Sequence, residues 1–62
     1  MKFTLQMNLD NDAFKENSSY EVARILNRLG TRLIDHPDLT TQSSPGSLHD
    51  KNGNRVGFWE VQ

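Results

Sequence analysis

The sequence predicts an α+β fold in which a single helix packs on one face of a three-stranded sheet. Three observations support the order strand, helix, strand, strand: an alternating strand, an amphipathic helix and a β-hairpin, at about residues 2–9, 19–35 and 47–61. With 62 residues, the chain is expected to form one domain over residues 1–62. That length is close to the lower limit for a core without disulfides or metal.

The first strand follows from a strict alternation of apolar and polar residues, which is typical of a strand with one buried face. The apolar positions are Met1, Phe3, Leu5, Met7 and Leu9. Residues 10–12, Asp-Asn-Asp, favour a turn through their own side chains. We expect Ala13 and Phe14 to form one helical turn that places Phe14 at the edge of the core.

The helix is predicted to begin with a capping box, in which Ser18 and Glu21 each bond the backbone of the other. Its apolar stripe consists of Val22, Ile25, Leu26, Leu29 and Leu33. Gly30 lies at the margin of this stripe, where the missing side chain would let the helix approach the sheet closely. The helix should end before Pro37, and a polar loop over about residues 36–46 should follow.

The hairpin prediction depends on Asn52-Gly53, the strongest two-residue signal for a primed turn. With that turn, the cross-strand pairs are Asp50 with Arg55, Leu48 with Gly57 and Gly46 with Trp59 on one face, and His49 with Val56 and Ser47 with Phe58 on the other. The single tryptophan then enters the core. We expect the last strand to be central, because it is apolar on both sides, and the sheet to be antiparallel. A parallel pairing of the first two strands is the alternative.

Composition excludes several classes of function. Seven Lys and Arg residues against eight Asp and Glu give a net charge of −1, so no global field attracts nucleic acid or an anionic membrane. The absence of cysteine excludes disulfides and thiolate zinc sites, and it agrees with a reducing compartment. No apolar run approaches the roughly 20 residues that cross a bilayer. We therefore expect a soluble, cytoplasmic protein without a membrane partner.

Two hypotheses of a metal site follow from the residue types. Asp50, Asn52 and Asn54 resemble the first ligands of a calcium loop. Such a loop also needs glycine in place of Arg55 and glutamate in place of Val61, so a hairpin turn is the favoured interpretation.

The second hypothesis places a metal at the two histidines. His36 and His49 have acidic residues near them in sequence, namely Asp35, Asp38 and Asp50. No pair has the spacing of ligands on one helix face, and the serines have no histidine at a relay position. We therefore predict no metal, no cofactor and no enzymatic activity.

A protein-binding surface is the first functional hypothesis. In the predicted register, Val56 and Phe58 lie with His49 on the sheet face that the helix leaves uncovered. Apolar residues on an open face often mark dimerisation or a protein partner. The alternative is that Phe14, or the loop after the helix, covers them.

Weak nucleic-acid binding is the second hypothesis. Arg24, Arg28 and Arg32 recur every four residues and would form a ridge of positive charge. Glu21 and Asp35 lie three residues from the ends of this ridge, which is also typical of a solvated helix face. No aromatic residue on that face is placed to stack on a base.

Three segments carry a resemblance to a family. They are Asp-Asn-Asp-Ala-Phe at residues 10–14, Glu-Val-Ala-Arg-Ile-Leu at residues 21–26 and Asp-x-Asn-Gly-Asn-x-Val-Gly-x-Trp-Glu at residues 50–60. The chain resembles short bacteriophage and prophage proteins that have no assigned activity. The resemblance implies an accessory protein that binds a component of the host cell. The chain departs from the pattern at Phe58, where the family more often has a polar residue.

Overall fold

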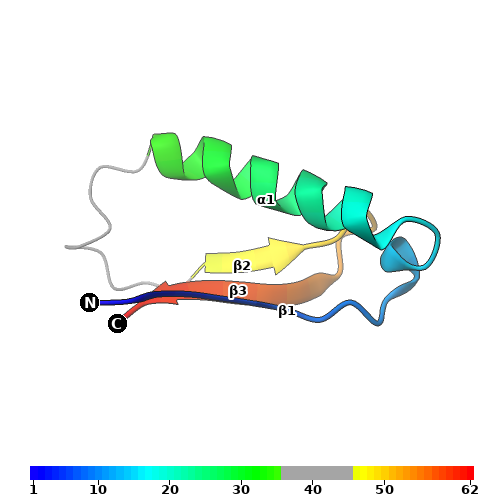
Figure 1. The fold of residues 1–62 in the computed structure, drawn as a ribbon, viewed down its shortest axis with the longest axis horizontal. Coiled ribbons are helices and arrows are strands. Elements are labelled where there is room, and N and C mark those ends of the chain that lie inside the picture. Colours follow the sequence, from blue (N-terminus) through cyan, green and yellow to red (C-terminus); the bar gives the residue numbers. More distant parts are fainter. Residues whose placement is uncertain (36–45) are drawn as a thin grey trace.

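The structure is a computed structural model, and it describes residues 1–35 and 46–62. Its elements are β1 (Phe3–Met7), η1 (a 3-10 turn, Asp12–Phe14), α1 (Ser18–Ile34), β2 (Gly46–His49) and β3 (Arg55–Val61). Helix α1 lies across one face of the sheet (Figure 1). The strand order is β1-β3-β2, and both pairings are antiparallel. The predicted fold class and the central position of the last strand are confirmed, and the parallel alternative is wrong.

The pairing of β1 with β3 brings the two ends of the described chain together (Figure 1). Leu5 lies opposite Trp59, and Lys2 and Gln62 exchange both backbone hydrogen bonds, with N···O distances of 2.5 and 2.8 Å. At Gly57, a Cβ atom would collide with the backbone carbonyl of Gln6. This position therefore needs glycine because the two strands approach closely there.

Trp59 is the centre of a small core, as predicted. Its side chain is 9% exposed and stacks on Phe3, with ring centroids 5.6 Å apart. Gly46 leaves the space that the indole occupies, because a Cβ atom there would overlap the ring. The other buried hydrophobic residues of the described chain are Ala13, Phe14, Ile25, Leu29, Leu48 and Val56. Phe14 reaches this core from η1, as the sequence predicts.

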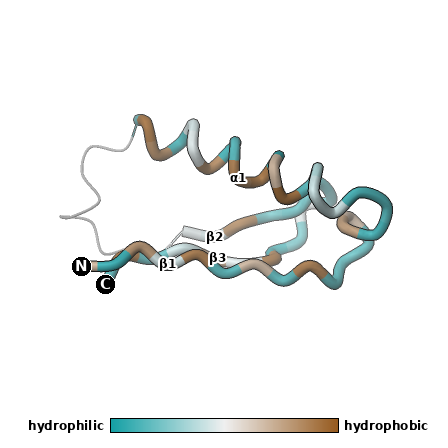
Figure 2. Tube along the Cα trace, viewed as in Figure 1, coloured by the Kyte–Doolittle hydropathy of each residue, from teal (hydrophilic) through white to brown (hydrophobic). Residues whose placement is uncertain are grey.

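Most hydrophobic positions of α1 lie on the side that faces the sheet (Figure 2). The helix is inclined, so that its C-terminal end lies farther from the sheet than its N-terminal end (Figure 1). Ile34, in the last turn, is accordingly 84% exposed; Leu26, which was predicted for the apolar stripe, is 43% exposed although its neighbours Ile25 and Leu29 are buried. A Cβ atom on Gly30 would meet nothing within 4 Å, so the expected close approach at this glycine is wrong.

The start of α1 also differs from the prediction. Asn17 caps the helix, because its side chain accepts a hydrogen bond from the Tyr20 amide at 3.1 Å. The predicted capping box between Ser18 and Glu21 is wrong, since Glu21 bonds partners outside the cap. The predicted loop at residues 36–45 lies outside the described residues.

The hairpin turn has three residues at its tip rather than two. Asp50 and Asn54 close it: the Asp50 amide donates to the Asn54 carbonyl at 2.9 Å, and the Gly53 amide donates to the Asp50 carbonyl at 3.0 Å. Gly53 has a φ of 86°, and no other residue in the described ranges has a positive φ. A primed two-residue turn needs a positive φ at Asn52 as well, so the predicted turn type is wrong.

This turn changes the register at the end of the hairpin. The pairs of Gly46, Ser47 and Leu48 are as predicted, but a bulge then pairs His49 with Arg55. The predicted pairs of His49 with Val56 and of Asp50 with Arg55 are therefore wrong. Val56 is the extra residue of this bulge, on β3.

Two glycine substitutions test this packing. Gly57→Ala should destabilise the protein by about 1–3 kcal/mol, because the new methyl group pushes β1 away from β3. Gly30→Ala should stabilise it by about 1 kcal/mol, because the helix gains propensity and the site is open. Urea unfolding followed by tryptophan fluorescence measures both. Equal effects of the two substitutions would contradict the described strand pairing.

Candidate functional site

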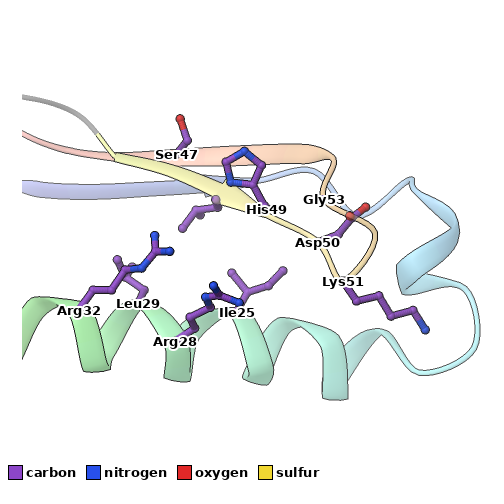
Figure 3. Close-up of a pocket in the computed structure, with 10 residues that line it drawn as sticks. Ile25, Arg28, Leu29, Arg32, Ser47, His49, Asp50, Lys51 and Gly53 are labelled. Atoms are coloured by element: carbon purple, nitrogen blue, oxygen red, sulfur yellow. The ribbon is translucent and has the colours of Figure 1, made fainter.

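A groove lies between α1 and the edge strand β2 (Figure 3). It encloses about 310 Å³. Its apolar lining consists of Ile25, Leu29 and Leu48, and its cationic lining consists of Arg28, Arg32 and Lys51. Ser47, His49, Asp50 and Gly53 complete it. We call this feature the α1–β2 groove.

Helical periodicity places the two arginines of the groove. Arg28 and Arg32 are one turn apart, and both side chains extend from α1 toward β2 (Figure 3). Ile25 and Leu29 belong to the adjacent apolar stripe and are buried beside them. The same helix therefore supplies both the apolar floor and the charged rim.

Arg24 belongs to the same ridge in sequence but has a different environment. Its guanidinium binds Glu21 through two hydrogen bonds, Nε to Oε1 at 2.8 Å and a terminal nitrogen to Oε2 at 2.9 Å. It also lies 3.5 Å from the backbone carbonyl of His49. The predicted ridge is therefore divided: Arg24 has a structural partner, whereas Arg28 and Arg32 line the groove.

Glu21 is buried, with 3% of its surface exposed, where α1 meets the hairpin. Besides Arg24, it accepts a hydrogen bond from the backbone amide of Lys51 at 2.7 Å. We call these three groups the helix–hairpin junction. The hydrogen bond from Arg24 lowers the pKa of Glu21, burial opposes this shift, and the Lys51 amide adds to the lowering. The junction fixes one end of the groove.

Asp50 organises the turn beside this junction. Its Oδ1 accepts hydrogen bonds from the amides of Asn52 and Asn54, both at 2.9 Å, and its Oδ2 accepts one from the Asn11 side chain at 3.1 Å. Burial raises the pKa of Asp50, but these hydrogen bonds together outweigh burial and hold it below the ordinary value. Asp50 therefore lines the groove with a carboxylate whose hydrogen bonds are already made to the turn.

The groove is positively charged although the chain is not. Arg28, Arg32 and Lys51 form no ion pair with the side chains of residues 1–35 and 46–62. The two ion pairs in those ranges join Lys15 to Asp12 and Arg24 to Glu21. Arg28, Arg32 and Lys51 thus lie around one hollow whose described lining contains a single acid, Asp50, and the turn amides already bond that carboxylate.

The structure brings the predicted protein-binding residues together only in part: His49 and Phe58 share the sheet face away from α1, and Val56 and Phe58 line a second hollow of about 620 Å³. Val56 is only 6% exposed and belongs to the core that contains Phe14, so its expected exposure is wrong. The bulge explains this, because it removes Val56 from the predicted pairing with His49. Phe58 is half-buried and pairs with Gln6 and Ser47, whereas His49 is exposed and lines the α1–β2 groove.

Sequence reasoning missed Lys51 as a site residue. Its contribution to the groove depends on a hairpin loop that is one residue longer than predicted and on contact with a helix 30 positions away. His36 and Asp38, from the second metal hypothesis, lie outside the described residues. Within residues 1–35 and 46–62, no three His, Asp or Glu side chains are grouped as metal ligands.

Comparison of the chain with protein-family models, with curated proteins and with solved structures gave no match. Among the described residues, no helix combines the length and the hydrophobicity needed to span a bilayer. The α1–β2 groove is therefore the feature from which a function can be inferred.

The two buried carboxylates predict how stability depends on pH. The pKa values of Glu21 and Asp50 lie below their ordinary values of 4.5 and 3.8, so the unfolded state binds more protons in acid than the folded state. The free energy of unfolding should stay constant from neutral pH to about pH 5 and fall as the pH drops through the lowered pKa values. Urea unfolding at a series of pH values measures this.

Glu21→Gln isolates the contribution of the helix–hairpin junction to the pH dependence of stability. This variant should be less stable than the parent at pH 7 and should lose less stability on acidification, because residue 21 no longer takes up a proton. Glu16→Gln, at an exposed position, is the matched control and should behave as the parent. An acid dependence that Glu21→Gln leaves unchanged would show that the junction does not contribute to it.

Proposed function

We propose that this protein is a non-enzymatic interaction module that binds a protein partner through the α1–β2 groove. The observation that carries the proposal is the pair of Arg28 and Arg32, which lie beside an apolar floor and have no ion-pair partner in the described structure. Unpaired charge beside buried apolar surface is typical of a binding site, because the fold itself gains nothing from the charges.

The proposal moves the binding surface from the open sheet face to the groove. Of the three residues predicted for protein binding, His49 lies at the edge of the groove on the same sheet face as Phe58, and Val56 is in the core. The origin in a phage or prophage, the cytoplasmic location and a host protein as partner are parts of the same proposal. They rest on the resemblance of residues 10–14, 21–26 and 50–60.

Weak nucleic-acid binding is the second candidate. Arg28 and Arg32 support it, because both are available at the groove. Arg24 does not, because its guanidinium is held by Glu21. No Phe, Tyr or Trp side chain lines the groove in the described residues, so the strongest base-stacking groups would not add to phosphate contacts. Protein binding is therefore the stronger candidate.

Charge reversal in the groove tests the proposal. The double variant Arg28→Glu with Arg32→Glu should lose a protein that the parent captures from a bacterial lysate, because the rim then repels the partner. Arg55→Glu changes the same charge outside the groove and should retain that protein. Circular dichroism should first show that both variants fold as the parent does. Capture that persists in the double variant, or fails equally in Arg55→Glu, would refute the groove as the docking surface.

A further inference from the structure

We infer that the α1–β2 groove takes an extended acidic peptide segment, which adds as a fourth strand to the outer edge of β2 and places alternate carboxylates against Arg28 and Arg32. This inference rests on the proposed function and specifies the chemistry of the partner. Three independent features support it: the orientation of the β2 backbone, the spacing of the two arginines and the apolar floor.

Strand β2 forms one edge of the sheet. In an antiparallel sheet, the hydrogen-bonding groups of successive residues alternate between the two sides of a strand. Lys2 and Gln62 exchange hydrogen bonds, and the Asn8 amide donates to the Val56 carbonyl at 2.7 Å. The even-numbered residues of β3 therefore direct their backbone N–H and C=O groups toward β1. Gly57 and Trp59 direct theirs toward β2.

The partners of Gly57 and Trp59 on β2 are Leu48 and Gly46. Ser47 and His49 consequently direct their N–H and C=O groups away from the sheet. The contact of Arg24 with the His49 carbonyl agrees with this orientation, because Arg24 approaches from outside the strand pair. By this alternation, and because the Asp50 amide donates to the Asn54 carbonyl, the amides of Ser47 and His49 face away from β3 and can receive the backbone of an added strand.

The spacing of the arginines selects a sequence pattern. Arg32 is four positions after Arg28, which corresponds to about 6 Å along the helix axis. Alternate residues of an extended strand lie about 6.7 Å apart and point to the same face. An acidic residue at every second position can therefore face both guanidinium groups, whereas two adjacent acidic residues point to opposite faces. Lys51 lies at the hairpin end of the groove, and its side chain extends away from Arg28 and Arg32 (Figure 3).

The groove fits a peptide better than nucleic acid or another copy of this chain. Its floor of Ile25, Leu29 and Leu48 offers apolar contact, and the free amides of β2 recognise peptide backbone. In this chain, Asp10 and Asp12 have the alternate pattern, but Asp12 begins η1 and pairs with Lys15. Because that segment is not extended, it cannot add as a strand to β2, and the acidic peptide must come from another protein.

The test uses two rhodamine-labelled peptides of one composition. Thr-Val-Glu-Val-Glu-Val-Thr has alternate carboxylates, and Thr-Val-Val-Glu-Glu-Val-Thr has adjacent ones. Fluorescence anisotropy at low salt should show that the folded full chain binds the first peptide about tenfold more tightly than the second. Arg28→Gln and Arg32→Gln should each weaken binding of the first peptide about tenfold, and Arg55→Gln should leave it unchanged. Equal affinity for the two peptides would overturn the predicted pattern.

Amide hydrogen exchange distinguishes strand addition from charge attraction alone, because only an added strand forms hydrogen bonds with the β2 amides. The first peptide should slow exchange at Ser47 and His49 and leave Leu48, which already faces β3, unchanged. Peptide binding without protection of these two amides would overturn strand addition. Preference for a single- or double-stranded oligonucleotide over the peptide would overturn the inference in favour of nucleic acid.

The inference and the proposed function can fail separately. If neither peptide binds while the parent still captures a protein that the Arg28→Glu, Arg32→Glu variant loses, the acidic strand is wrong and the groove remains a docking surface. If groove-dependent capture fails as well, both are wrong. A third outcome is that light scattering shows the parent to be a dimer and the same double variant to be a monomer. That result would mean that the groove binds a second copy of the chain and not an acidic peptide.

Discussion

The position of the hairpin against the helix depends on one buried carboxylate. Glu21 accepts two hydrogen bonds from Arg24 and one from the Lys51 amide, and only 3% of its surface is exposed. A buried carboxylate without partners is strongly destabilising, so this set of contacts admits few alternative arrangements. Because the helix–hairpin junction holds the hairpin tip at the first turns of α1, it also sets where β2 runs beside the helix.

The junction explains why three arginines with equal spacing have different functions. Arg24 is close enough to Glu21 to neutralise it, and this pair sits at the end of the groove. Arg28 and Arg32 lie one and two turns farther along α1 and form no ion pair with the described residues. The same helical repeat thus supplies one arginine held by the fold and two that line the groove without an ion-pair partner in the described structure. Asp50 plays the complementary part in the hairpin, where four hydrogen bonds from nearby groups hold its charge.

Local patterns predict the elements of this fold, and long-range contacts decide the details. Period-two alternation, the helical stripe and the apolar last strand were sufficient for the order of elements and the burial of Trp59, and they favoured a central last strand without excluding the parallel alternative. The turn was not predictable from Asn52-Gly53, because the Asp50 carboxylate bonds two turn amides and favours a longer loop with positive φ at Gly53 alone. That loop and the bulge beside it moved Val56 into the core.

The candidate site was predicted in part. The arginine ridge is visible in the sequence, and Arg28 and Arg32 do line the groove. The division between them and Arg24 is not visible, because it depends on a contact between Glu21 and a backbone amide 30 residues later. The free edge of β2 likewise follows from strand order, which local patterns do not determine.

The most direct test of this account is an NMR pH titration that follows the Glu21 carboxyl carbon and the Lys51 amide proton in the same sample. If the junction exists as described, both signals change with one midpoint, and that pKa lies below 4.5. A Glu21 midpoint at or above 4.5, with a Lys51 amide that does not respond, would contradict the account.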